Sequence, residues 1–206
     1  LNDAIVESCD TYFYGLGFKM GIDTMSRYFS YFGFGVNASI DVVEARDGIL
    51  PSRQWKRDVK RRAWYPGDSL NFSIGQGYLL ATPLQLASAA AMLANRGAWI
   101  APRFLKTIKT AEGELLPNPM KGEVSVEPYE PNDMKNMEFV ISAMEEVMHG
   151  SRGTARSSGR NASYKMAGKT GTAQVVGIKQ GEKYDAEALT ERHRDHALFI
   201  GFAPVV

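Results

Sequence analysis

The sequence predicts an α/β chain of the α+β kind, in which an antiparallel sheet is flanked by helices. Two late segments, 164–176 and 196–203, have the composition of strands, and the polar stretch 178–195 joins them as an antiparallel pair. Helical patterns precede these strands, and such helices pack on the faces of a sheet. With 206 residues, of which 44% are apolar, the chain suffices for one domain or most of one.

The first helical patterns lie on either side of a short loop at residues 8–10. Residues 2–8 and 11–20 predict short helices that flank it. Asp23 begins another helix, and Gly33 ends it, because glycine is the usual residue at a left-handed helix terminus.

Two later helices have stronger patterns. Thr82 is a predicted N-cap, and Pro83 suits the first helical position. Residues 84–94 are small and apolar on nearly every face, so we expect a buried helix that crosses the centre of the domain. Residues 132–148 predict a helix with a core-facing apolar stripe. The stripe consists of Met134, Met137, Val140, Ile141, Met144 and Val147.

Three segments predict irregular structure. Residues 150–159 are rich in serine, arginine and glycine, which is typical of a loop. Residues 112–131 contain four prolines and predict a surface excursion. The glycines of Gly75-Gln76-Gly77 permit a tight turn, in which Gln76 can tie backbone groups together.

The run Lys169-Thr170-Gly171-Thr172 is the most informative motif. On a strand it offers one cation and two hydroxyls along an exposed edge, which suits a substrate carboxylate. The K-T-G element is found in β-lactamases and penicillin-binding proteins, together with S-x-x-K and S-D-N. The motif alone therefore predicts a serine acyl-transfer site only if its companions are present.

Ser8-Cys9-Asp10 is a partial second motif. A serine and an aspartate two residues apart on a tight loop can both point into one cleft, where the hydroxyl relays a proton and the carboxylate orients an amide. Alternatively, Asp10 caps the helix that begins at Thr11, since aspartate is a favoured N-cap. The two roles are compatible.

The third motif, S-x-x-K, would supply the nucleophile, and no serine of the chain has lysine three residues later. The chain ends in the apolar run 197–206, as a shortened strand would. We therefore expect residues 1–206 to be a partial domain, with the nucleophile upstream and the final strands and helix missing.

Five segments resemble the transpeptidase domain of class B, elongation-type penicillin-binding proteins, the penicillin-binding protein 2 family. They are Ser-Cys-Asp-Thr-Tyr-Phe-Tyr (8–14), Ile-Gly-Gln-Gly-Tyr (74–78), Ala-Thr-Pro-Leu-Gln (81–85), Lys-Thr-Gly-Thr-Ala-Gln (169–174) and Arg-Asp-His-Ala (194–197). The resemblance covers nearly the whole chain and implies a β-lactamase/transpeptidase-like fold. The missing S-x-x-K is the departure from the family pattern.

The resemblance implies a peptidoglycan cross-linking D,D-transpeptidase that acts on D-Ala-D-Ala stem peptides through a serine acyl-enzyme and is inhibited covalently by β-lactams. The catalytic residues that it implies in this chain are Ser8, Asp10, Lys169 and Thr172, and the substrate-binding residues are Thr170, Gly171 and Thr172. Ser8 would relay a proton with electrostatic support from Lys169, and the backbone N–H of Thr172 would form half of the oxyanion hole. Without the upstream serine and lysine, the fragment alone is expected to be inactive.

The family also implies a place and partners. The domain would lie at the periplasmic face of the bacterial inner membrane, with an anchor helix outside this chain and elongation-complex membrane proteins as partners. The sequence has no stretch of 18 apolar residues that could span a bilayer. Its formal net charge of +1 gives no global field to favour nucleic acid.

No cofactor is required by this chemistry, but Cys9 leaves two possibilities. It can be a small buried hydrophobic residue, or a Zn²⁺ ligand whose other ligands lie outside the chain, as in some relatives. His193 and His196 have an H-x-x-H spacing without the zinc-helix pattern, and alternation along a strand would place them on opposite faces. We interpret both histidines as structural or solvated.

A basic run lies between Trp55 and Trp64. Its members are Lys56, Arg57, Lys60, Arg61 and Arg62. The ordinary interpretation is a solvated face, and the alternative is a contact with an anionic glycan-lipid substrate or a partner protein.

Three other functions remain possible at this stage. A serine β-lactamase shares the K-T-G strand, but turns penicillin over rather than releasing it slowly. A division-type class B penicillin-binding protein is nearer, although Ser8-Cys9-Asp10 favours the elongation type. A non-catalytic peptide-binding module would keep the cleft without the nucleophile.

Overall fold

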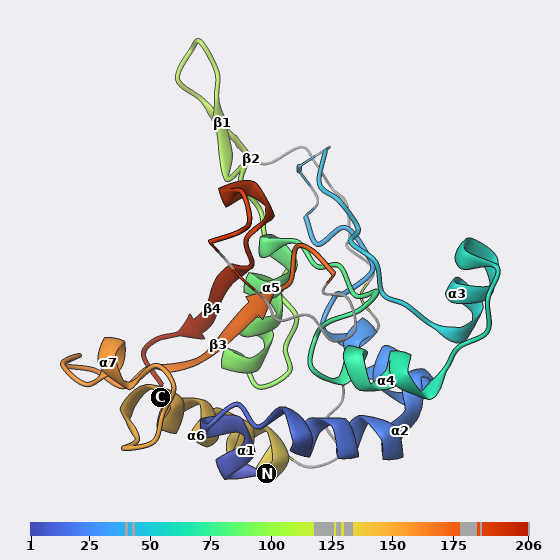
Figure 1. The fold of residues 1–206 in the computed structure, drawn as a ribbon. Helices are drawn as coiled ribbons and strands as arrows, with labels where there is room; N and C mark the ends of the chain where they lie inside the picture. Colours follow the sequence, from blue (N-terminus) through green and yellow to red (C-terminus); the bar gives the residue numbers. More distant parts are fainter. Residues whose placement is uncertain are drawn as a thin grey trace. The chain divides into compact units, whose positions relative to one another are not determined.

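The computed structural model describes residues 1–39, 41–42, 44–117, 126, 129, 134–177, 185 and 187–205. The chain forms two compact units, whose elements are drawn in Figure 1. One unit combines Leu1–Asp10 with Val140–Val206, and the other is Thr11–Phe139. Helices and antiparallel strand pairs are both present, so the predicted α+β class is confirmed.

In the unit that contains the N-terminus, helices α1 (Asn2–Val6), α7 (Arg156–Gly159) and the end of α6 (Met134–His149) provide the packing surface. Figure 1 shows α1 beside α6, where Asn2 Nδ2 donates a hydrogen bond to Glu146 Oε2 at 3.0 Å. The turn after α6 closes back on this helix, since the Ala155 N–H donates to the Val147 carbonyl. Buried apolar side chains form the core here, namely Val6, Ile141, Met144, Val147, Met148, Ala155 and Ala167.

The sheet of this unit pairs β3 (Ala167–Ala173) with β4 (His196–Phe202) in antiparallel register. Ala167 lies opposite Phe202, and Ala173 lies opposite His196. Gly168 is required by close packing, because a Cβ there would lie 2.3 Å from Cζ of Phe199. The short 3₁₀ helix η1 (Glu191–His193) precedes β4.

The other unit is mainly helical. It contains most of α2 (Asp10–Tyr31), then α3 (Arg53–Lys60), α4 (Pro66–Ser73) and α5 (Pro83–Ala94), followed by the antiparallel hairpin of β1 (Thr107–Lys109) and β2 (Leu115–Pro117). Ile22 and Met25 of α2 pack with Phe72 of α4 in a buried cluster. This packing places α4 against α2 and fixes the position of the loop between α3 and α4.

Gln85 of α5 is a buried polar anchor. Its side chain is inaccessible to solvent, and its Oε1 accepts a hydrogen bond from the N–H of Thr82 while the Thr82 hydroxyl accepts from the Gln85 N–H. Its Nε2 also approaches the carbonyls of three loop residues, Gly33, Val36 and Asp47, at 3.3, 2.9 and 2.9 Å. The predicted cap of α5 is therefore also a brace for the loops that follow α2.

Several helix predictions are confirmed with small differences. The break predicted between residues 20 and 23 occurs at Gly21, whose φ of 71° and ψ of 162° kink α2 without ending it. The turn at Gly75-Gln76-Gly77 is present, with positive φ at both glycines. Of the α6 stripe, Met137, Ile141, Met144 and Val147 are buried, whereas Met134 is 41% exposed.

Three predictions need correction or lie outside the description. Residues 156–159 form α7, so the segment 150–159 is not all loop. Residues 115–117 of the predicted surface excursion 112–131 form strand β2, and all three are exposed, which agrees with a surface segment; Pro117 is tolerated there because it lies at the strand end. Most of the rest of that segment, and residues 132–133 of the predicted helix, lie outside the described residues.

Candidate functional site

The tight turn between α1 and α2 presents the candidate proton-relay serine. The backbone closes over the end of α1, where the N–H of Cys9 donates to the carbonyl of Ala4 at 2.9 Å. Ser8 has a φ of 55°, in the left-handed region that non-glycine residues seldom adopt. Asp10 is the first residue of α2, so its carboxylate lies in the first turn, where the helix dipole favours negative charge.

Strand β3 brings Lys169 to this turn. The Lys169 ammonium donates a hydrogen bond to Ser8 Oγ, although the two residues are 161 positions apart in the sequence. It also donates to the Thr170 carbonyl at 2.9 Å and lies 3.5 Å from Thr170 Oγ1. The two motifs predicted from the sequence therefore meet in one site.

Burial changes the acidity of the lysine. Lys169 is half-buried, and loss of solvent lowers its pKa below the usual 10.5, while the negative charge of Asp10 acts in the opposite direction. A lysine with a lowered pKa gives up its proton more readily, and a serine hydroxyl that passes its own proton on can take it up. The ammonium is thus suited to a proton-relay role beside Ser8.

The rest of the K-T-G-T run forms an accessible strand edge. Thr170 is half-buried, whereas Gly171 and Thr172 are exposed. A Cβ at Gly171 would meet only Leu198 Cβ, at an ordinary distance of 3.9 Å, so packing within the chain does not require glycine there. The lack of a side chain instead leaves space beside the strand for a ligand.

Thr154 is a site residue that sequence reasoning missed. Its Oγ1 lies 3.0 Å from Oγ1 of Thr170, within hydrogen-bond distance. It comes from the turn between α6 and α7, which the composition marks only as a loop. No local pattern distinguishes it, since its proximity to β3 arises from the tertiary packing of that turn.

The buried interpretation of Cys9 is wrong, because the residue is exposed on the turn between two helices. The zinc interpretation gains no support. Within the described parts of the chain, no group of three or more His, Cys, Asp or Glu side chains is placed to hold a metal ion. Cys9 alone does not fit zinc, which usually takes four ligands.

The two histidines do not share a strand as expected. His193 lies in η1 and His196 begins β4, because the chain turns between them. Both are exposed, and His193 Nδ1 lies 3.3 Å from Thr190 Oγ1. Their interpretation as structural or solvated residues agrees with this placement.

A serine held by the lysine of a K-T-G strand, within helices and an antiparallel sheet, defines the transpeptidase/β-lactamase-like class of fold. The chain belongs to the penicillin-binding protein transpeptidase domain family, which matches residues 1–205. This confirms the family and the fold that the sequence motifs indicated.

Curated relatives of this chain include peptidoglycan D,D-transpeptidases of two bacteria. The chain is 40% identical over 204 residues to the peptidoglycan D,D-transpeptidase MrdA of Acinetobacter baumannii, a match that covers 99% of this chain and 29% of that protein. It is also 40% identical to MrdA of Escherichia coli K12, covering 98% of this chain and 31% of the relative. The chain thus spans about three tenths of the length of these curated relatives.

Solved structures of PBP2 proteins match this chain in both fold and sequence. Pseudomonas aeruginosa PBP2 in complex with WCK 5153 matches with a TM-score of 0.81 and 43% identity, over 99% of this chain and 41% of that one. The complex of Helicobacter pylori PBP2 with MreC matches with a TM-score of 0.79 and 31% identity, over 100% of this chain and 34% of the other.

Proposed function

We propose that the protein to which residues 1–206 belong is a peptidoglycan cross-linking D,D-transpeptidase of the elongation type. The observation that carries this proposal is the hydrogen bond from Lys169 to Ser8, which assembles two of the three motifs of serine acyl transfer. The relatives named as peptidoglycan D,D-transpeptidases, at 40% identity, support the same activity.

The reaction divides into acylation and transfer. A serine nucleophile, with the lysine of S-x-x-K as its base, attacks the D-Ala-D-Ala carbonyl of a stem peptide, and D-Ala leaves. An amine of a second stem peptide then takes the acyl group. Both the nucleophile and its base belong to a segment upstream of residue 1, since no serine of this chain has lysine three positions later.

The residues of this chain hold the substrate and move a proton. Ser8 Oγ, which accepts a hydrogen bond from Lys169, passes a proton to the leaving amine and regains one from the lysine. Thr170 and Thr172 bind the substrate carboxylate along the exposed edge of β3, and Gly171 leaves space for it. Asp10 orients the substrate, and the Thr172 N–H supplies half of the oxyanion hole.

β-Lactams inhibit this protein by acylating the same upstream serine. Its partners are the stem peptides and membrane proteins of the elongation complex, a kind of partner supported by the H. pylori PBP2 complex with MreC. Its place is the periplasmic face of the inner membrane. Among the described helices, none is long and apolar enough to cross a membrane.

Fluorescent-penicillin labelling tests the proposal. A longer form of the protein that includes the upstream S-x-x-K segment should label, whereas the chain of 206 residues should not. In the longer form, Lys169→Ala should label far more slowly than Lys165→Ala, which removes an exposed lysine paired with Glu145 outside the site.

Two results would argue against the proposal. If neither form labels although both are folded, the chain is a non-catalytic peptide-binding module. If the label is lost within minutes by turnover, the protein is a β-lactamase, because a transpeptidase releases bound penicillin slowly.

A further inference from the structure

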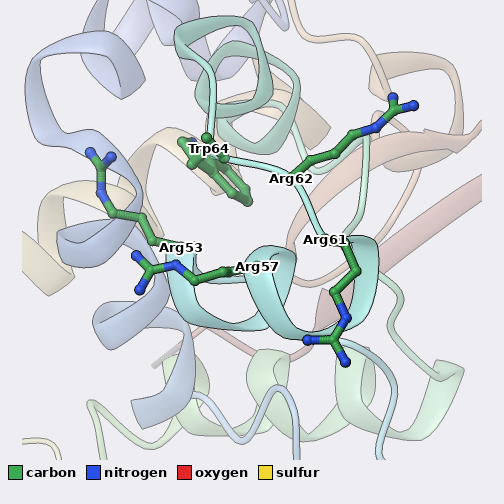
Figure 2. A pocket seen from close by; sticks show the side chains of 6 residues that line it. Arg53, Arg57, Arg61, Arg62 and Trp64 are labelled. Carbon is green, nitrogen blue, oxygen red and sulfur yellow. The ribbon is translucent and has the colours of Figure 1, made fainter.

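The unit Thr11–Phe139 contains a pocket in which four of the six lining residues are arginines. Its volume is about 420 Å³, and it is lined by Arg53, Arg57, Arg61, Arg62, Ala63 and Trp64 (Figure 2). Arg53 and Arg57 are one helical turn apart on α3, so they share a face of that helix. In Figure 2 their guanidinium groups extend to one side of Trp64, and those of Arg61 and Arg62 extend to the other.

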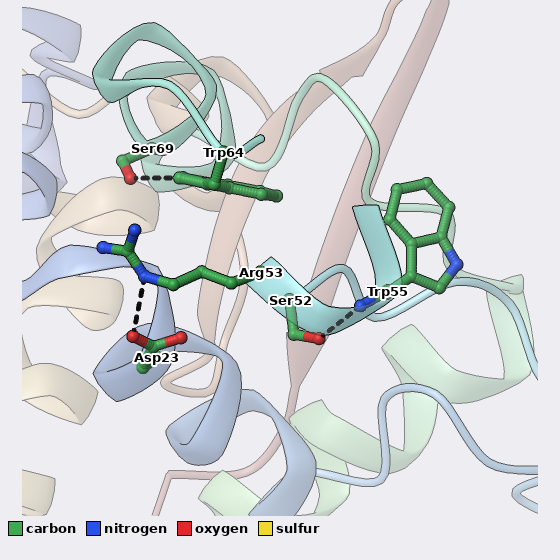
Figure 3. A network of polar contacts seen from close by, with 6 residues as sticks. All are labelled: Asp23, Ser52, Arg53, Trp55, Trp64 and Ser69. Carbon is green, nitrogen blue, oxygen red and sulfur yellow. Dashed lines mark hydrogen bonds and ion pairs between the residues drawn. The ribbon is translucent and has the colours of Figure 1, made fainter. Parts of the chain in front are cut away.

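Trp64 forms a fixed wall of this pocket. Its Nε1 donates a hydrogen bond to Ser69 Oγ of α4 at 2.9 Å, as Figure 3 shows. Ser52 caps the start of α3 by accepting from the N–H of Trp55, which anchors the helix that carries two of the arginines. The aromatic wall and α3 are therefore both held in place by contacts outside the pocket.

The acidic groups around the pocket leave most of its charge uncompensated. Asp23 pairs with Arg53 Nε at 2.9 Å, an exposed contact that occupies only part of one guanidinium group. Asp58 accepts hydrogen bonds from Gln54, and Asp68 is paired with buried Lys56. Within the described parts of the chain, no carboxylate forms an ion pair with Arg57, Arg61 or Arg62.

Arg61 has a backbone conformation that favours glycine. It is the C-cap of α3, with φ 56° and ψ 33°, and its N–H donates to the carbonyl of Arg57. Glycine usually fills such a left-handed helix end, because a side chain there adds strain. Folding of α3 therefore does not call for arginine at this position, and strained residues of this kind gather at functional sites.

We propose that this pocket binds a phosphate or pyrophosphate group. Arginine forks match phosphate oxygens two at a time, and several uncompensated guanidinium groups favour an anion with more than one charge over a single carboxylate. Arg53 and Arg57 grip the anion beside the Trp64 ring, and Arg61 and Arg62 extend the positive wall. The site is independent of the proposed transpeptidase function, since none of its residues belongs to the β3 site.

Calorimetric titration of the chain with pyrophosphate and with inorganic phosphate, at low ionic strength, tests this site. The expected result is saturable binding at one site, tighter for pyrophosphate. Arg57→Gln should weaken it about tenfold in Kd, the loss of about 1.4 kcal/mol. Lys60→Gln is the matched control, because it removes the same charge from the same helix without lining the pocket, and it should change the Kd less than about twofold. Equal losses in both variants, or no saturable binding, would overturn the proposal.

Arg61→Gly provides a test in which misfolding cannot explain a loss of pyrophosphate binding. Glycine relieves the left-handed strain, so the variant should unfold at the same or a higher urea concentration while binding pyrophosphate less tightly. Unchanged binding would remove Arg61 from the site and leave its conformation unexplained, which contradicts the proposal.

Vesicle sedimentation distinguishes two sources of the phosphate group. If the ligand is a lipid headgroup, phosphatidylglycerol vesicles should retain the chain, phosphatidylcholine vesicles should not, and Arg57→Gln should reduce retention more than Lys60→Gln. If the source is soluble, pyrophosphate should bind while both vesicle types fail to retain the chain. Failure of all these probes would reject the site without affecting the penicillin-labelling test.

Discussion

Lys56→Met should destabilise the protein strongly, although the residue belongs to a basic run that reads as a solvated surface. Its side chain is only 2% exposed, and its ammonium forms an ion pair with Asp68. It also lies over three aromatic rings, those of Trp64, Tyr65 and Tyr78, with centroids 5.7, 4.6 and 5.2 Å away. Removing the cation leaves a carboxylate that is 16% exposed without its main partner.

The expected loss follows from this geometry. Breaking one side of a buried ion pair costs about 3–5 kcal/mol. Asp68 retains the hydrogen bond from the Tyr65 N–H at 2.7 Å and some solvent, so the lower end applies, about 3 kcal/mol. For a chain of this size that corresponds to a decrease in Tm of roughly 6–12 °C. Urea denaturation followed by tryptophan fluorescence measures the change.

Lys60→Met is the matched control. Lys60 is exposed on the same helix, and its ammonium is about 6 Å from two ring centroids, at 6.0 Å for Trp55 and 5.9 Å for Tyr78. Its loss should cost less than about 1 kcal/mol. If the two methionine variants unfold at the same urea concentration, the buried Lys56–Asp68 pair is not a significant source of stability and the reasoning fails.

Four further substitutions probe the Gln85 brace, the packing of β3 and the candidate site. Gln85→Ala removes the Oε1 acceptor of the Thr82 N–H and the two Nε2–H donors that three loop carbonyls share. At about 0.5–1.5 kcal/mol for each of these groups, the free energy of unfolding in urea should fall by roughly 1.5–4.5 kcal/mol. Burial lowers the pKa of Lys169 in the folded chain below 10.5. At pH values between that lowered pKa and 10.5, Lys169 is protonated in the unfolded chain and deprotonated in the folded chain. The stability of the wild type should therefore rise relative to that of Lys169→Met as the pH rises through this window. Gly168→Ala places a Cβ 2.3 Å from the ring of Phe199 and should cost about 1–3 kcal/mol, whereas Gly171→Ala should leave stability nearly unchanged but slow penicillin labelling of the longer form.

Each of these predictions has a matched comparison. Gln54→Ala removes an exposed contact with Asp58 and should cost under about 0.5 kcal/mol, so an equal loss for Gln85→Ala would contradict the brace. For Lys169 the comparison is between the wild type and Lys169→Met: if their difference in stability does not change with pH in that window, burial does not lower the pKa of Lys169. Normal labelling by Gly171→Ala would show that the substrate does not approach that edge of β3.

Much of the candidate site could be predicted because its chemistry lies in contiguous motifs. The K-T-G-T run fixes the order of cation, hydroxyl and glycine along β3, and the run Ser8-Cys9-Asp10 places a hydroxyl and a carboxylate two residues apart on one turn. The strand pair was predictable because apolar and small residues at 164–176 and 196–203 flank a long polar stretch. That Lys169 reaches Ser8 across 161 positions needed the family resemblance or the structure, since no local pattern encodes it.

The features that sequence reasoning missed depend on tertiary contacts. Thr154 approaches Thr170 only because the turn after α6 folds toward β3. The helix α7 occupies just four residues, too few for a periodic pattern to show. Cys9 follows apolar residues, yet the turn exposes it, because the buried face of α1 ends before it.

In the basic run, the helical period determines which charged side chains are buried and which are exposed. Arg53 and Arg57 are separated by four residues, so they occupy one face of α3 and line the pocket, while Lys56 points to another side and is buried among aromatic rings. If the helical period is ignored, a run of like charges predicts one solvated face. With the helical period, the run divides into Lys56, which points inward and holds α3 to α4 through Asp68, and the arginines, which point outward and are available to an anion. The Lys56→Met and Arg57→Gln variants should therefore differ in kind: the first loses stability, and the second loses binding.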